Sequence, residues 1–137
     1  MTRSLLSIAY IILLSLLCVS CATSKPGSDY YADNGNMYSY LDENLSKSII
    51  VTETYTELTN SGDRQAIVIV QNASSVPITA KYRFQWFDLS GIPIAQKTTW
   101  RHTDITGLDT ISLTDVTADL EAHTYKVIFT SNTSSIR

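Results

Sequence analysis

The chain has 137 residues, of which 44% are hydrophobic and 17% charged, and its formal net charge is −3. This mildly acidic balance gives no electrostatic basis for binding DNA, RNA or an anionic lipid surface. Its only two cysteines, Cys18 and Cys21, lie near the N-terminus, so the rest of the chain cannot hold a disulfide framework or a thiolate metal site. The length is enough for one hydrophobic core.

The first twenty residues predict a secretory signal peptide. Arg3 gives a short positive region, an uncharged apolar run follows at 5–17, and the small residue Ser20 precedes Cys21. This three-part layout is typical of signals that are removed after export. The apolar run is shorter than the roughly 20 residues of a membrane-spanning helix, which makes a retained anchor the weaker alternative.

The sequence Cys18-Val19-Ser20-Cys21 resembles the lipobox of bacterial lipoproteins, although Cys18 stands where a leucine is usual. We therefore expect cleavage after Ser20 and attachment of lipid, including palmitate-type acyl chains, to the thiol of Cys21. Several acyl chains would anchor the protein stably. By the same resemblance, Ala22 in place of aspartate favours the outer membrane, with the domain facing the periplasm. The alternative is that both cysteines form a disulfide or pack as small apolar residues.

Cleavage would leave 117 residues with a net charge of −4, because Arg3 is the only charged residue removed. The segment 21–47 is rich in Ser, Asp, Asn and Gly and has no sustained apolar period, so we predict a flexible tether with at most one helical turn at 41–45. The alternative is that its tyrosines order the segment against a partner or against its own domain: Tyr30, Tyr31, Tyr38 and Tyr40.

From residue 48 to 137 the apolar residues follow a period of two, which predicts strands. In the clearest strand, 78–86, one face is apolar and the other polar, as expected for a half-buried strand. The apolar face is formed by Ile78, Ala80, Tyr82, Phe84 and Trp86. Further strands are predicted at 49–58, 65–71, 92–100, 109–116 and 123–130.

Turn-forming residues separate these strands at 60–63, 72–77 and 88–91, and Gly91 suits a positive φ. About six or seven short strands predict an all-β, immunoglobulin-like sandwich in one domain, 48–137. An open barrel is the alternative, since the paired cysteines of true immunoglobulin domains are absent.

The stretch KYRFQWFDLSGIP at 81–93 resembles the YcfL-like family of small lipoproteins of Gram-negative bacteria. The matching residues are Tyr82, Arg83, Phe84, Trp86, Asp88 and Gly91, with Phe87 for the usual tyrosine. The resemblance implies a periplasmic, outer-membrane-anchored protein of unknown biochemical function. Some members of that family look like neighbours of lipoprotein activators of peptidoglycan synthases.

Residues suited to catalysis lack the spacing that catalysis needs. His102 and His123 form no metal-binding pair, and we expect no metal and no cofactor. Glu53 and Glu57 would lie about 13 Å apart along a strand, beyond the roughly 5–9.5 Å of glycosidase pairs. We expect them to be solvated charges on an edge strand. No hydrolase motif is present, so the sequence predicts no enzyme.

Two aromatic groups are candidates for binding. Tyr82, Phe84 and Trp86 could form a sugar-stacking platform, but their alternation with polar residues predicts a core. Trp100 and Arg101, at the end of a predicted strand, are candidates for contact with a partner.

We therefore expect a non-catalytic accessory lipoprotein of the bacterial cell envelope. Sheet edges or end loops, such as 72–77 and 101–109, would bind an envelope protein. A peptidoglycan- or glycan-binding module and an envelope enzyme with a dispersed site are the alternatives, and the fold alone does not choose among them.

Overall fold

The computed structural model describes residues 29–131. They form eight strands and one short helix: β1 (Asp29–Tyr31), β2 (Met37–Tyr40), α2 (Glu43–Ser48), β3 (Ile49–Leu58), β4 (Arg64–Asn72), β5 (Ile78–Phe87), β6 (Arg101–Ile105), β7 (Thr110–Thr117) and β8 (Thr124–Ser131).

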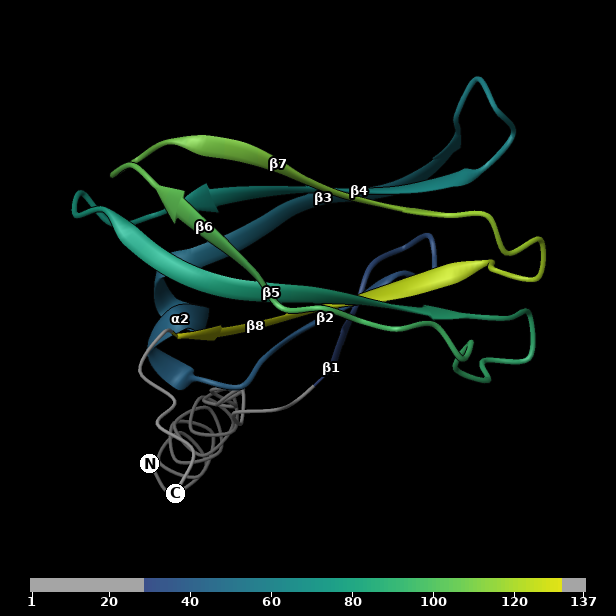
Figure 1. The fold of residues 1–137 in the computed structure, drawn as a ribbon. Helices are drawn as coiled ribbons and strands as arrows, with labels where there is room; N and C mark the ends of the chain where they lie inside the picture. The colour runs from purple at the N-terminus through teal and green to yellow at the C-terminus, as the bar shows by residue number, and fades with distance from the viewer. Residues whose placement is uncertain (1–28, 132–137) are drawn as a thin grey trace, which may run out of the picture.

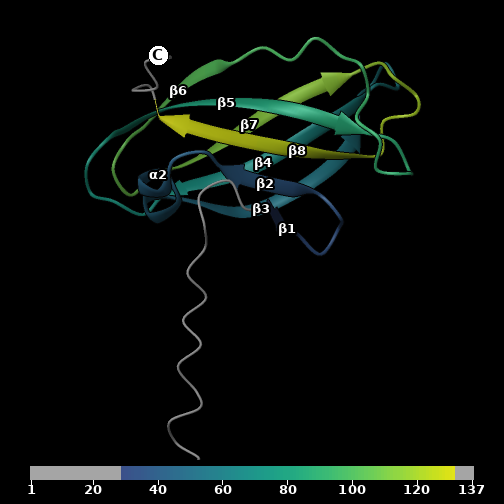
Figure 2. The same cartoon turned by 90° about the horizontal axis from the view of Figure 1, so that it is seen from below.

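The strands form two sheets that lie face to face (Figure 1). One has five strands in the order β1-β2-β8-β5-β6, and the other has three in the order β3-β4-β7. All neighbours are antiparallel except β2 and β8, which are parallel. Figure 2 shows the strands of the two layers crossing at an angle. The predicted all-β sandwich is confirmed, and the barrel alternative is wrong because the sheets do not close on each other.

The inner faces of the sheets form one core. The aromatic stripe of β5, Tyr82, Phe84 and Trp86, is buried there, as its alternation predicted, so its rings are not open to stack on a sugar. From β8, the Tyr125 hydroxyl crosses the core and donates a 2.7 Å hydrogen bond to the Ile67 carbonyl of β4. Burial raises the pKa of Tyr125, so the hydroxyl stays protonated and ties the two layers together.

The predicted flexible tether at 21–47 is wrong for residues 29–47, which belong to the domain. These residues form β1, β2 and α2, and Tyr30, Tyr38 and Tyr40 order them against the sandwich, as the alternative proposed, whereas Tyr31 is 74% exposed. Residues 21–28 lie outside the described part of the chain. The domain therefore begins some twenty residues earlier than the predicted boundary at 48.

The tyrosines hold this segment through ring contacts. Tyr30 stacks on Tyr38 with ring centroids 5.1 Å apart, and Tyr40 stacks on Phe129 of β8 at 5.5 Å. The buried Tyr40 hydroxyl donates a 2.7 Å hydrogen bond to the Ile49 carbonyl at the start of β3. Because β2 pairs with β8, which follows almost 90 residues later, local sequence patterns give little sign of it.

The predicted strand at 92–100 is also wrong. Pro93 forms an isolated bridge with Phe87, and regular pairing with β5 begins at Arg101, opposite Tyr82. Phe87 lies five positions from Tyr82, whereas Pro93 lies eight positions from Arg101, so the second segment is three residues too long for one continuous ladder, and residues 94–100 form no regular pairing. β6 therefore begins only at Arg101, in a region expected to be a loop.

The strand directions divide the loops between two ends of the sandwich (Figure 1). At one, which we call the α2 end, lie α2 and the loops 73–77 and 106–109. At the other, which we call the far end, lie the loops 59–63, 88–92 and 118–123. β1 begins on the side of the α2 end and runs toward the far end, because Asp29 pairs with Ser39 and Tyr31 with Met37.

Candidate functional site

The residues expected to be processed, Ser20 and Cys21, lie outside the described part of the chain. Within residues 29–131, no helix is long and apolar enough to cross a membrane. Within the same range, no three His, Cys, Asp or Glu side chains gather as a metal site would require. His102 lies on β6 rather than in a loop, and His123 immediately precedes β8.

Arg101 joins the two sheets at one edge of the sandwich. Its guanidinium donates to the Thr114 carbonyl at 2.7 Å and forms an ion pair with Asp115 of β7. The other carboxylate oxygen of Asp115 accepts a 2.9 Å hydrogen bond from Nε1 of the buried Trp86. Burial lowers the pKa of Arg101, but the hydrogen bond and charge of Asp115 outweigh it and raise the pKa overall. Arg101 is thus engaged within the domain.

Trp100 is half-buried, and its ring packs against the guanidinium of Arg83. The Arg83 guanidinium carbon lies 4.7 Å from the centroid of the Trp100 ring. The Nε of Arg83 is buried without a hydrogen-bond partner among the described residues. Trp100 and Arg101 therefore have structural contacts, and their role in binding a partner stays a prediction.

Asn72 ties together the two loops of the α2 end. Its buried side-chain amide nitrogen lies within hydrogen-bond distance of the carbonyls of Val76, Ile105 and Thr106, at 2.8 to 3.2 Å. Its side-chain oxygen accepts from the Ser74 amide at 2.8 Å. These bonds lock the predicted contact loop 72–77 against the residues that follow β6.

The same two loops also touch through their backbones. The Leu108 amide donates to the Ser74 carbonyl at 2.9 Å. A Cβ added at Gly107 would lie 2.1 Å from the Ser75 oxygen, so only glycine permits this approach. Leu108 has φ +62°, which is unfavourable for a residue with a side chain, and that side chain is 64% exposed.

The far end carries two turns with the same hydrogen-bond arrangement. Asp88 accepts hydrogen bonds at 2.8 Å from the amides of Ser90 and Ile92, and Asp119 accepts one at 2.9 Å from the Glu121 amide. Each is a turn in which an aspartate side chain replaces a backbone acceptor. Gly91 completes the first turn with the predicted positive φ, +77°. A leucine follows each aspartate.

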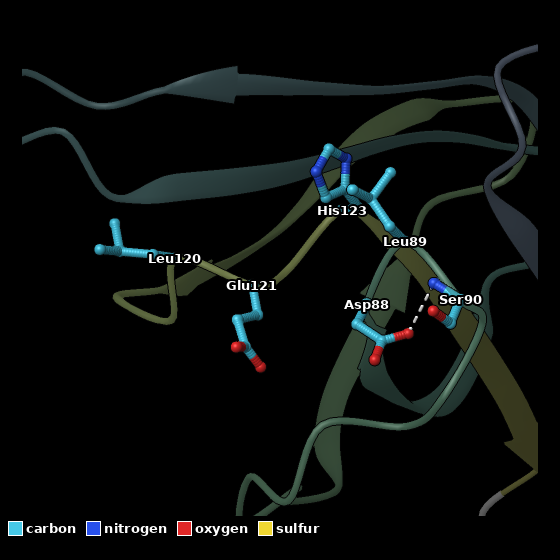
Figure 3. A pocket seen from close by; sticks show the side chains of 6 residues that line it. All are labelled: Asp88, Leu89, Ser90, Leu120, Glu121 and His123. Carbon is cyan, nitrogen blue, oxygen red and sulfur yellow. Dashed lines mark hydrogen bonds between the residues drawn. The ribbon is translucent and has the colours of Figure 1, made fainter.

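Those two leucines project into solvent on either side of a pocket. Leu89 is 80% exposed and Leu120 is 87% exposed. Between their loops lies an open pocket of about 350 Å³, also lined by Asp88, Ser90, Glu121 and His123. In Figure 3 the carboxyl groups of Asp88 and Glu121 lie below the two leucines, and the His123 ring lies beside Leu89. Leu58 and Ile92 are also exposed at this end, by 67% and 61%.

This end was missed from the sequence because its two halves are about thirty residues apart. A signal was present, since Asp88-Leu89 and Asp119-Leu120 both place a leucine in the middle of a turn. A turn position normally holds a polar residue or glycine. A leucine there has no core to enter, which indicates a surface role.

Comparisons with known proteins agree with this fold. The family described as a protein of unknown function, DUF1425, matches residues 38–130. No curated protein matches the chain. The crystal structure of Cj0090 from Campylobacter jejuni is similar, with a TM-score of 0.58 and 18% identity, over 69% of this chain and 96% of that one.

A DUF1425 family member from Shewanella sp. pv-4 is also similar, with a TM-score of 0.55 and 17% identity, over 75% of this chain and 94% of that one. At these identities the two structures support the fold alone. The family match covers well over half of the chain, from β2 to β8. The protein described here therefore belongs to the DUF1425 family.

Proposed function

We propose that this protein is a non-catalytic, YcfL-like lipoprotein of the Gram-negative cell envelope that binds another envelope protein through the far end. In this proposal it is cleaved after Ser20 and held at the outer membrane, facing the periplasm, by lipid on Cys21. The observation that carries the proposal is the pair of Asp-Leu turns, which present Leu89 and Leu120 on both sides of one pocket.

Single exposed leucines are common on protein surfaces, but several gathered at one end support an interaction site. The turns support it further because their backbones are already hydrogen-bonded. Asp88 and Asp119 fix the loops that carry the leucines, so little conformational entropy would be lost on binding.

The path of the chain also favours the far end as the surface that binds the partner. Asp29 lies eight residues after Cys21, so the connecting segment could reach at most about 29 Å. β1 then runs toward the far end, so the chain joins the sheet from the α2 side. An anchor at Cys21 would thus leave the far end directed away from the membrane, toward the periplasm.

The other prominent polar groups support a non-catalytic role. Asp115 bonds both to Arg101 and to the Trp86 indole between the sheets, and Asn72 bonds to loop carbonyls. Each of these side chains therefore has a structural task.

In-cell crosslinking followed by mass spectrometry tests the partner. We expect one envelope protein to be captured reproducibly by the wild-type chain and to be lost when Leu89 and Leu120 are both changed to Ser. Recovery of peptidoglycan fragments without any protein would contradict the proposal and support the glycan-binding alternative.

Acyl labelling tests the anchor. Cys21→Ser should abolish incorporation of labelled palmitate and release the protein from the membrane fraction, whereas Cys18→Ser should do neither. Loss of label in Cys18→Ser alone would show that the acceptor is assigned wrongly.

A further inference from the structure

The lining of the far-end pocket combines exposed apolar side chains with two carboxylates. Leu89 and Leu120 are the exposed apolar residues of its lining, and the carboxyl groups of Asp88 and Glu121 lie on the same side of the pocket, below the leucines in Figure 3. No lysine or arginine is among the six lining residues, and His123 is the only lining residue that can gain a positive charge. The pocket therefore attracts cations.

The two carboxylates differ in how they are held. One oxygen of Asp88 is used by the turn, where it accepts from two backbone amides. The exposed Glu121 side chain is free of any ion pair identified among residues 29–131. Its charge is thus available to a ligand, and the fixed charge of Asp88 beside it adds to the negative potential.

From this arrangement we propose that the far end recognises a basic side chain flanked by aliphatic residues on the partner protein. A lysine or arginine would enter between Asp88 and Glu121, and its aliphatic neighbours would cover Leu89 and Leu120. This inference rests on the proposed function and adds the chemistry of the partner segment. Charge complementarity favours such a segment over an acidic or purely apolar one.

The test uses the full-length chain in detergent micelles, with amide NMR signals as the measurement. The probes are two blocked tripeptides, acetyl-Leu-Lys-Leu-amide and acetyl-Leu-Glu-Leu-amide. We expect the lysine peptide to shift the signals of 88–92 and 119–123, but not those of 73–77. The glutamate peptide should shift neither set.

Variants then test the charges. Glu121→Gln should weaken binding of the lysine peptide about fivefold and Glu121→Lys about tenfold, which is the scale of one contact charge pair in water. Glu53→Gln, which removes an exposed carboxylate on β3, is the matched control and should bind like wild type.

Equal shifts from both peptides, or wild-type affinity in Glu121→Lys, would overturn the inference. The proposed function would survive that result if in-cell crosslinking still captured a protein that depends on Leu89 and Leu120. If no protein is captured, the proposed function fails, whatever the peptides show.

Discussion

The two ends of the sandwich hold their loops in place by different contacts. At the α2 end, the loops bond to each other through Asn72 and the Leu108 amide, and Gly107 lets their backbones touch. At the far end, each loop is fixed by its own aspartate, and a pocket of about 350 Å³ separates them. One end is closed by contacts between loops, and the other holds its loops firmly but apart.

This difference indicates which end of a small sandwich can bind a ligand. Loops that satisfy each other contribute to stability, so changes there should unfold the domain. Loops that are fixed separately leave surface between them for a ligand at little cost in entropy. Measurements of the free energy of unfolding therefore separate the two ends, since we assign stability to the α2 end and binding to the far end.

The largest effect is expected for Asn72→Ala at the α2 end. Its buried amide would leave loop carbonyls without a donor, at roughly 1–3 kcal/mol for each unsatisfied group, so we expect a loss of about 3 kcal/mol in the free energy of unfolding. Asp88→Ala at the far end should cost only about 1 kcal/mol, because the amides it frees can bond to water. Urea denaturation followed by circular dichroism measures both, and equal losses would contradict the comparison.

Gly107→Ala should come next, with a loss of about 2 kcal/mol, because the new Cβ would collide with the backbone of Ser75. Gly62→Ala at the far end is the matched control. It has φ +88° and no atom within 4 Å of an added Cβ, so only backbone strain of about 1 kcal/mol should remain. A harmless Gly107→Ala would show that the two loops are not packed as described.

Leu108→Gly should instead stabilise the protein by about 0.5 kcal/mol. Glycine removes the strain of the positive φ, which is roughly 1–2 kcal/mol. It also raises the conformational entropy of the unfolded chain, which offsets part of this gain. Val76→Gly, an equally exposed residue of the facing loop, lacks that relief and should destabilise by about 0.5–1 kcal/mol. Thermal unfolding of both variants checks the sign, and a destabilised Leu108→Gly would argue against strain at this position.

The smallest effect on stability is expected at the far end. Leu89→Ser and Leu120→Ser should each change the free energy of unfolding by less than about 0.5 kcal/mol, because both side chains are mostly exposed. A loss above 1 kcal/mol in either would show that the leucines support the fold instead of a partner.

The sequence was most informative where apolar and polar residues alternate along a strand. β3 has its predicted bounds, β5 ends one residue later than predicted, and β4, β7 and β8 differ from theirs by one residue at each end. Alternation predicts such strands because it reports directly on which face is buried. The buried stripe of Tyr82, Phe84 and Trp86 was predictable for the same reason.

The errors came from features that alternation does not report. The unpaired residues after Pro93 depend on register with β5, and β2 depends on a partner far along the chain. The two Asp-Leu turns of the candidate site could have been identified from the sequence, because each places a leucine within a turn. That Leu89 and Leu120 flank one pocket follows only from the packing of β5 beside β8.

The most direct test of the account compares the two ends in living cells. A photo-crosslinking amino acid is placed at position 90, on the rim of the far-end pocket, or at position 76, on an exposed loop of the α2 end. We predict that position 90 captures one envelope protein and that position 76 does not. Capture of the same protein from position 76 alone would contradict the assignment of binding to the far end.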